Sequence, residues 1–275
     1  MITTIIFSKN RACQLDLLLR SIEKNFSHIS TDIRVLFCAT TDEFMHGYDI
    51  IEQRFPNVKF TLEFDFQDDT LKLLNNCKDY TCFFVDDNIV YRKPEVDAHG
   101  IKQLFENIEQ VGCFSFRLGL NTVIQDMYSE QRVHPWPIME RINMYNEYDV
   151  LLWSWRSVPP NNFGYPFSVD GHVYDKEMVI NALDYEFITP NALEGRFPMK
   201  QVPPVMMCLD QSSVFNNSIN LVGSSNNNAG KFYPHSLEEL NQAYLDGKQI
   251  NLDHICNNDI VGCHQEVKIT LGDYK

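Results

Sequence analysis

The first 85 residues alternate short apolar runs with segments in which apolar side chains recur every three or four positions. An unbroken apolar run is typical of a buried strand, and the three-to-four spacing is typical of an amphipathic helix. We therefore expect strands at residues 2–7, 33–39, 58–64 and 80–85, and helices at 15–26, 44–55 and 68–77. Asn10 is expected to cap the first helix. Strands that alternate with helices pair in parallel through right-handed crossovers, so the pattern predicts an α/β fold with a mostly parallel, doubly wound sheet.

The pattern is less regular after this point. The expected elements are a helix at 98–108, strands at 113–118 and 150–156, a helix at 175–183, and a helix through residue 245. A capping box of Ser236 and Glu239 opens the last helix. Residues 121–149, with the sequence His-Pro-Trp-Pro at 134–137, are expected to form an insertion near the substrate. Residues 216–230, rich in Asn, Ser and Gly, are expected to form a loop that closes over a ligand.

Composition narrows the class of protein. The chain has 275 residues, of which 44% are hydrophobic, so it can build a sizeable core. Its formal net charge of −14 argues against a nucleic-acid partner, which would require a basic surface. The sequence contains no transmembrane segment and no signal peptide, which predicts a cytoplasmic location. The eight cysteines form no CxxC pair, and Cys256, Cys263 and His264 fit no standard zinc spacing.

The clearest chemical signal is Asp86-Asp87-Asn88, which directly follows the apolar strand at 80–85. Ligands of doubly wound sheets bind at the carboxyl ends of the strands. Paired carboxylates at that edge suit Mg²⁺ or Mn²⁺, which could bridge to a diphosphate. A polar turn that merely ends the strand is the alternative interpretation.

Three motifs in this order resemble a known family: SKNR after the first strand, TTD after the second, and FFVDDNIVYR around the fourth. The sequence is similar to nucleotide-diphospho-sugar glycosyltransferases of the GT-A fold, family-2 type. The resemblance implies one domain over 1–275, with a nucleotide-sugar half at about 1–96 and an acceptor half, containing a smaller sheet, at about 97–275. It covers roughly residues 1–200 and a C-terminal histidine.

The resemblance also implies roles for residues. The nucleotide-sugar is expected to contact Ser8, Lys9, Arg11, Thr40, Asp42 and Asp86. The metal, Mn²⁺ or Mg²⁺, is expected to be bound by Asp87, Asn88 and His264, although Asn88 stands where many members have Asp. Glu194 is the first candidate for the catalytic base and Asp170 the second, because an acceptor hydroxyl must lose its proton. The usual Glu-Asp pair is absent at Glu194, which leaves retaining transfer open.

The resemblance thus predicts a metal-dependent, inverting transfer of a sugar from a nucleotide-diphosphate donor, with a UDP-sugar favoured, to a hydroxyl of a glycan or glycolipid. Two other functions remain. A sugar-phosphate nucleotidyltransferase would share the sheet and the metal but normally has a Gly-rich loop after the first strand, which SKNR lacks. A non-catalytic carbohydrate- or nucleotide-binding module would bind the donor without turnover.

Overall fold

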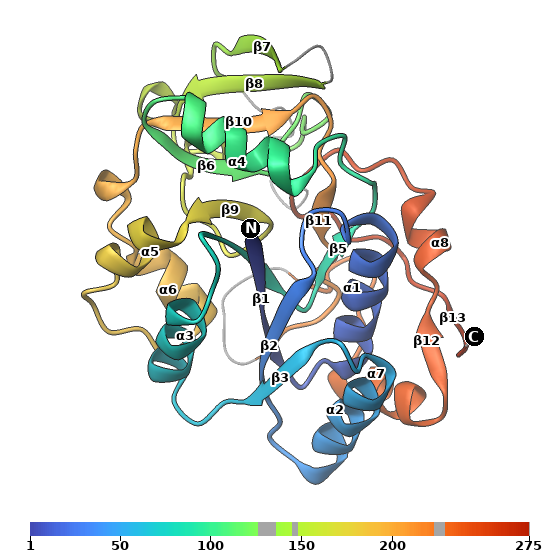
Figure 1. Cartoon of the computed structure of the whole chain (residues 1–275). Helices are drawn as coiled ribbons and strands as arrows, with labels where there is room; N and C mark the ends of the chain where they lie inside the picture. Colours follow the sequence, from blue (N-terminus) through green and yellow to red (C-terminus); the bar gives the residue numbers. More distant parts are fainter. Residues whose placement is uncertain (126–135, 145–147, 223–228, 275) are drawn as a thin grey trace.

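The computed structural model describes residues 1–125, 136–144, 148–222 and 229–274. Its centre is a nine-stranded sheet in the order β3-β2-β1-β4-β9-β6-β10-β8-β7 (Figure 1). The first four strands in sequence are β1 (Ile2–Lys9), β2 (Asp32–Cys38), β3 (Lys59–Leu62) and β4 (Tyr80–Val85). They are neighbours and pair in parallel, which confirms the predicted α/β sheet.

The second half of the sheet is mixed. It contains β6 (Val111–Ser115), β7 (Glu140–Met144), β8 (Tyr148–Ser154), β9 (His172–Asp175) and β10 (Val205–Leu209). β9 pairs antiparallel with both β4 and β6, and β8 pairs antiparallel with both β10 and β7. Since β6 and β10 are parallel, β8 and β9 are the two strands of this sheet that oppose the others. The sheet is therefore mostly parallel, as predicted. β7, β9 and β10 were not expected from the sequence.

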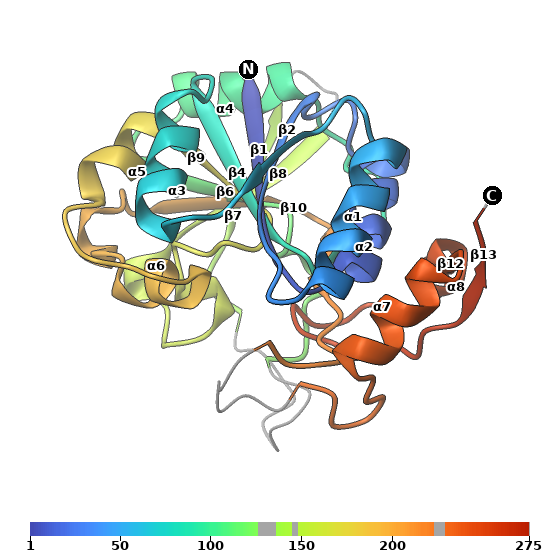
Figure 2. The same ribbon diagram turned by 90° about the horizontal axis from the view of Figure 1, so that it is seen from below.

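Helices cover both faces of the sheet, as Figure 2 shows. The α-helices are α1 (Ala12–Asn25), α2 (Asp42–Arg54), α3 (Phe66–Asn75), α4 (Ala98–Asn107), α5 (Lys176–Ala182), α6 (Pro190–Arg196), α7 (Leu237–Leu245) and α8 (Leu252–Cys256). Short 3-10 helices are η1 (Trp155–Ser157), η2 (Asn162–Gly164) and η3 (Met199–Gln201). Alternate side chains of β1 enter separate cores: Ile6 packs with α1, whereas Ile5 and Phe7 pack with α3.

Two small sheets accompany the main one. β5 (Asn88–Val90) pairs with β11 (Val214–Asn216), and β12 (Lys248–Ile250) pairs with β13 (Leu271–Asp273). Because β5 begins at Asn88, the β5–β11 ribbon starts immediately after Asp86-Asp87. Two strands far apart in sequence therefore meet beside the predicted site.

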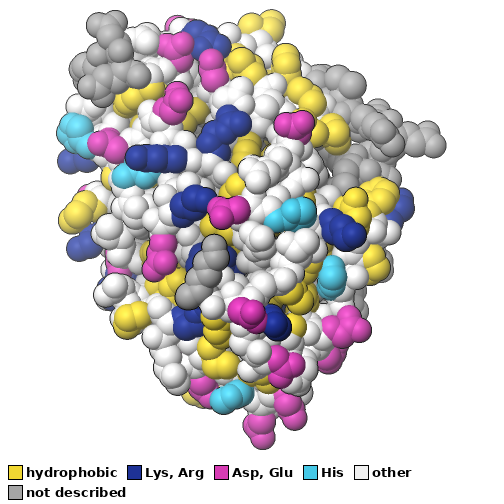
Figure 3. Space-filling view, turned by 90° about the vertical axis from the view of Figure 1, so that its right-hand side faces the viewer, with side chains coloured by type: hydrophobic (Ala, Val, Ile, Leu, Met, Phe, Trp, Pro, Cys, Tyr) yellow, Lys and Arg dark blue, Asp and Glu magenta, His cyan; other side chains and the backbone are white. Residues whose placement is uncertain are grey.

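A buried ion-pair network attaches the C-terminal segment to the first two helices. Asp16 is fully buried and accepts hydrogen bonds or ion pairs from Arg20 (2.7 Å), Arg54 (2.8 Å) and the Tyr244 hydroxyl (3.2 Å). The Arg54 guanidinium also lies 4.0 Å from the centre of the Tyr274 ring. α7 and β13 are thereby fixed against α1 and α2. On the face that includes this region, basic and acidic side chains are interspersed (Figure 3).

The structure corrects several local predictions. Asn10 does not cap α1, because it adopts a φ of 56° and lies one residue too early. Arg11 is at the N-cap position, but its side chain makes no hydrogen bond to the amides of the helix. The segment 121–149 is more than an insertion, because β7 extends the main sheet; its residues 126–135, including His134 and Pro135, and 145–147 lie outside the described residues.

The predicted loop at 216–230 starts as strand β11, and its residues 223–228 also lie outside the described part. The predicted cap at Ser236 is confirmed, since its hydroxyl accepts a hydrogen bond from the Glu239 amide at 3.0 Å. Among the residues described, no helix has the length and apolar character needed to cross a membrane.

Candidate active site

Asp86 is fixed by the last residues of β1. β1 and β4 end side by side, with Phe7 opposite Val85, and the Asp86 amide donates to the Phe7 carbonyl at 3.1 Å. One oxygen of the Asp86 carboxylate then accepts hydrogen bonds from the Ser8 hydroxyl and the Lys9 amide, both at 3.0 Å. Ser8 is held in turn by the buried Tyr48 hydroxyl at 2.7 Å. The two strand ends thus place Ser8 and Asp86 in direct contact.

Arg11 joins both carboxylates of the pair. Its Nη1 lies 2.9 Å from Asp86 Oδ1 and 3.2 Å from Asp87 Oδ2, and its Nη2 donates to the Asn220 carbonyl at 2.6 Å. Only about 10% of the Arg11 side chain is exposed. Burial lowers the pKa of Arg11, but the charges of Asp86 and Asp87 outweigh it and raise that pKa above its ordinary value.

The β5–β11 ribbon brings Asp170 to the same place. The Asn216 side-chain amide donates to Asp87 Oδ1 at 3.0 Å and to Asp170 Oδ1 at 2.9 Å. The Asn88 amide also donates to Asp170, at 3.2 Å. Arg117, just beyond the end of β6, lies 3.3 Å from the other Asp170 oxygen. Burial raises the pKa of Asp170, but Arg117 and the amide donors hold it below its ordinary value.

Glu194 lies in the second turn of α6, with an oxygen accepting from the Val169 amide at 3.2 Å. Its position beyond the first turn excludes the simple role of a carboxylate at a helix N-terminus. Burial, followed by the charge of Asp170, raises the pKa of Glu194 to about 7. A carboxylate with this pKa can accept a proton near neutral pH.

His264 approaches the cluster from the C-terminal segment. The His264 backbone forms a β-bridge with Asn216, and its ring Nε2 is hydrogen-bonded to a guanidinium nitrogen of Arg117. Burial and the charge of Arg117 lower the pKa of His264 to about 4. The imidazole is therefore neutral at neutral pH, which is the form that binds metals.

Other predicted contacts lie at the margin. Thr40 is exposed, and its amide and hydroxyl bind the side chain of Asn10 at 2.9 and 2.8 Å. Asp42 is exposed in the first turn of α2. The Lys9 residue is exposed, although its main-chain amide binds Asp86. These three residues belong to the same edge of the sheet, but their side chains take no part in the buried cluster.

Sequence reasoning missed Arg117, Asn216 and Asn220. Arg117 fell inside the strand expected at 113–118, whereas β6 ends at Ser115, so the sequence did not mark Arg117 as a residue beyond a strand end. Asn216 lies in an Asn-rich stretch whose composition is typical of a loop, which concealed a buried strand end. Nothing in the sequence links Asn220 to Arg11, 209 positions away.

The chemistry of the cluster fits a divalent cation. Three aspartates face two guanidiniums, and burial together with the charges of Asp86 and Asp170 raises the pKa of Asp87 even though Arg11 opposes this. Asn216 Oδ1 is buried and accepts no hydrogen bond. Carboxylate and amide oxygens and a neutral imidazole are ligands that Mn²⁺ accepts. In the described residues, however, no three His, Cys, Asp or Glu side chains already surround one point.

The individual predicted ligands differ in availability. Asn88 Oδ1 accepts the Val85 amide at 2.8 Å, so it serves the turn after β4. Both oxygens of Asp87 have partners, Arg11 and Asn216. An ion at Asp87 would therefore share these oxygens with Arg11 and Asn216, and its charge would oppose that of Arg11.

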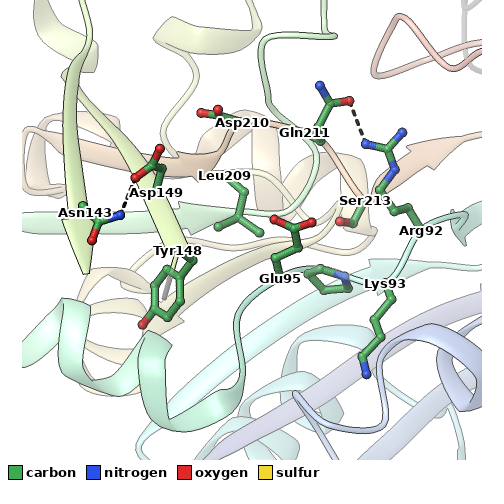
Figure 4. Close-up of a pocket in the computed structure, with 11 residues that line it drawn as sticks. Arg92, Lys93, Glu95, Asn143, Tyr148, Asp149, Leu209, Asp210, Gln211 and Ser213 are labelled. Atoms are coloured by element: carbon green, nitrogen blue, oxygen red, sulfur yellow. Dashed lines mark hydrogen bonds between the residues drawn. The ribbon is translucent and has the colours of Figure 1, made fainter. Parts of the chain in front are cut away.

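A cleft of about 290 Å³ lies apart from this cluster (Figure 4). Its lining includes Arg92, Tyr148 and Asp210, and Arg92 donates to Gln211 at 2.7 Å. None of its lining residues belongs to the predicted site. The β5–β11 ribbon connects the two places, since Asn216 lies in the cluster and Ser213, just before β11, lines the cleft.

Comparisons with known proteins agree with the predicted fold. No family model matches the chain. The chain is 25% identical over 292 residues to "Bifunctional glycosyltransferase pgtA" of Dictyostelium discoideum, which covers 94% of this chain and 37% of that protein. It therefore spans little more than a third of this relative's length.

Among solved structures, S. aureus TarS superposes with a TM-score of 0.51 at 12% identity, over 78% of this chain and 36% of TarS. TarS 1-349 in complex with UDP gives a TM-score of 0.48 at 13% identity, over 78% of this chain and 59% of that one. The likeness to TarS confirms the GT-A fold. The curated relative confirms the resemblance to glycosyltransferases.

Proposed function

We propose that the protein is a glycosyltransferase that moves a sugar from a nucleoside-diphosphate donor, with a UDP-sugar favoured, to a hydroxyl of a glycan or glycolipid. The observation that carries this proposal is the buried cluster at the ends of β1 and β4, where Arg11 and Asn216 join Asp86, Asp87 and Asp170. Burial and the charge of Asp170 raise the pKa of the Glu194 carboxyl to about 7. Similarity to a glycosyltransferase over 94% of the chain supports it. The half at about 1–96 would hold the nucleotide and the half at about 97–275 the acceptor.

The donor would lie along the edge formed by β1, β2 and β4. Asp86 is held rigidly by Ser8 and Lys9, as a residue that binds a ribose hydroxyl must be. Thr40 and Asp42, exposed beyond β2, would face the base. Lys9 and Arg11 would contact the diphosphate.

Asp87 and His264, with Asn88 in the adjoining turn, would hold Mn²⁺ or Mg²⁺. The buried side-chain oxygen of Asn216 would be a further ligand. The ion, when bound, would neutralise the diphosphate that leaves. The donor chemistry of the cluster and its excess of carboxylates over guanidiniums support a metal-dependent transfer.

Glu194 would act as the base of an inverting transfer. It accepts the proton of the acceptor hydroxyl while the hydroxyl oxygen bonds to the anomeric carbon and the bond from that carbon to the diphosphate oxygen breaks. The Val169 amide orients the carboxylate. Asp170, the second candidate, is bound by Arg117 and two amides, which favours its charged form and a positioning role. Glu194 is therefore the better base.

The acceptor would approach from the downstream half. Of the three tryptophans, Trp153 is buried and Trp155 donates to the Pro203 carbonyl, whereas Trp136 is 49% exposed. The Trp136 indole donates to the Thr122 carbonyl. The neighbouring Val123 and Ile124 pair with the chain just before His264. An exposed indole that is bound to this segment suits stacking on a sugar ring.

The first experiment measures thermal shifts with UDP, GDP, dTDP and CMP, each with and without Mn²⁺. Wild type is compared with Asp87→Asn and with Asp79→Asn, a control whose carboxylate is 74% exposed. We expect a metal-dependent rise for one nucleotide that is lost in Asp87→Asn and kept in the control. Turnover is then followed as release of that nucleoside diphosphate from its sugar donors. The absence of a shift with every nucleotide would reject the proposal, and binding without turnover across acceptors would indicate a binding module.

A further inference from the structure

The guanidinium of Arg11 pairs with the two aspartates beside which the proposed metal ion would bind. Arg11 bridges Asp86 and Asp87, and its far nitrogen is bound to the Asn220 carbonyl. The side-chain amide of Gln14 also donates a hydrogen bond to the side-chain oxygen of Asn220, at 3.0 Å. A cavity of about 10 Å³ touches both aspartates, which is room for about one water. Without a ligand, Arg11 therefore offsets part of the negative charge of the aspartate pair, and little free space remains beside the two carboxylates.

A metal ion arriving by itself would have to compete with this guanidinium. The ion would attract Asp87 but would also separate Arg11 from one of its two carboxylates. A buried charge that loses its partner is strongly destabilising. The metal alone therefore gains little from the site.

Arg11 nevertheless has an unused hydrogen-bond donor. Its Nε is buried without a partner, and so is the side-chain nitrogen of Asn220. The other buried ion-pair network offers a contrast: the nitrogens of Arg20 and Arg54 that meet Asp16 belong to side chains with no such orphan atom. Arg117, the other arginine of the cluster, also has a buried Nε without a partner, so this feature marks the two cluster arginines and gives Arg11 a donor for a further anion.

We propose that Arg11 couples metal binding to nucleotide binding. It blocks the divalent cation while it pairs with Asp86 and Asp87, and it releases Asp87 when a diphosphate offers it another anion. Metal and nucleoside diphosphate then bind together with positive cooperativity, and each binds weakly by itself. This inference rests on the proposed function, because it takes the ligand to be a nucleoside diphosphate.

The test is a binding cycle on the full chain, with Mn²⁺ followed by the electron paramagnetic resonance signal of the free ion. Affinity for Mn²⁺ is measured with and without saturating UDP, or whichever diphosphate gave the largest thermal shift. The variants are Arg11→Gln and Arg11→Lys, and Arg92→Gln serves as a control that removes an exposed arginine from the separate cleft. Circular dichroism confirms that each variant is folded.

In the wild type we expect the nucleotide to raise Mn²⁺ affinity by a factor within the usual range of roughly 5 to 150. Arg11→Gln should bind Mn²⁺ alone about tenfold more tightly than wild type and bind the nucleotide more weakly. The factor by which the nucleotide raises Mn²⁺ affinity should fall about tenfold in this variant. Arg11→Lys keeps the charge and should remain closer to wild type for Mn²⁺ alone. Arg92→Gln should match wild type.

Unchanged or weaker binding of Mn²⁺ alone in a folded Arg11→Gln would overturn the inference, and so would a failure of every variant to bind Mn²⁺. If no variant binds any nucleotide while Arg11→Gln gains Mn²⁺ affinity, the competition between Arg11 and the metal stands and the proposed function fails. The two failures are therefore distinguishable.

Discussion

Glu194 should destabilise the folded protein above neutral pH, and this cost can be measured without a substrate. Its folded-state pKa is about 7, against an ordinary value of 4.5, chiefly because the group is buried and secondly because Asp170 is negatively charged. The folded state therefore holds a proton that the unfolded chain releases. For a raised pKa, the stabilising contribution is complete below about pH 4.5 and is lost as pH rises through about 7.

The size of the effect follows from the two pKa values. The interval between 4.5 and about 7, at about 1.4 kcal/mol for each tenfold change in proton affinity, corresponds to about 3 kcal/mol. Glu194→Gln removes the charge and keeps an oxygen for the Val169 amide. The variant should match wild type within about 1 kcal/mol near pH 5 and be more stable by about 2–3 kcal/mol near pH 8.

Urea unfolding near pH 5 and near pH 8 gives the required free energies of unfolding. Glu186→Gln is the control, since it removes an exposed carboxylate a few residues before α6 and should change stability little at either pH. In a turnover assay, Glu194→Gln should lower kcat by about 10²- to 10⁴-fold, and wild-type kcat/KM should rise with pH around 7. A variant that is equally or less stable than wild type near pH 8 would refute the electrostatic argument, and undiminished kcat would refute the role as base.

Substitutions at two further positions, Asp16 and Asn10, test how residues around the site contribute to stability. Asp16→Asn leaves Arg20 and Arg54 without their buried carboxylate and should lower the free energy of unfolding by about 3–5 kcal/mol, measured by urea unfolding. Asn10→Ala loses the two bonds to Thr40 and must keep a positive φ, whereas Asn10→Gly loses only the bonds; the Ala variant should therefore be less stable than the Gly variant by about 1 kcal/mol in thermal unfolding. Equal stability of the two Asn10 variants would show that the left-handed backbone is not under strain.

The part of the fold that could be predicted is the part with strong periodicity. The predicted strand 80–85 coincides with β4, and α1 and α2 lie within a few residues of their expected positions. Each of these elements shows one dominant period in sequence. β9 has four residues and β11 has three, which is too short to display alternation. Their pairing is decided by tertiary contacts, and the sequence carries little trace of it.

The same reason separates the predictable half of the candidate site from the rest. Ser8 lies at the end of the apolar strand β1 and Asp86 directly follows β4, and the rule that ligands bind at carboxyl ends of parallel strands points to both. Thr40 and Asp42 were expected by the same rule, yet their side chains stay outside the buried cluster: Thr40 is bound by Asn10, and Asp42 is exposed in the first turn of α2. Strand ends define the edge of the sheet, but the side chains decide which groups meet there.

The direction of β9 explains why carboxylates from the second half join this cluster at all. β9 runs antiparallel to β4, so the start of β9 lies at the edge where β4 ends. Asp170 precedes that start, and Gly171, with a φ of 71°, makes the turn and donates its amide to the Phe83 carbonyl of β4 at 2.7 Å. A substitution that adds a side chain at Gly171 would meet Val214 at about 3.1 Å while forcing a backbone conformation that L-residues avoid. One reversed strand thus brings the acidic residues of both halves together, so the excess negative charge that Arg11 and a metal would share is a direct consequence of the sheet's topology.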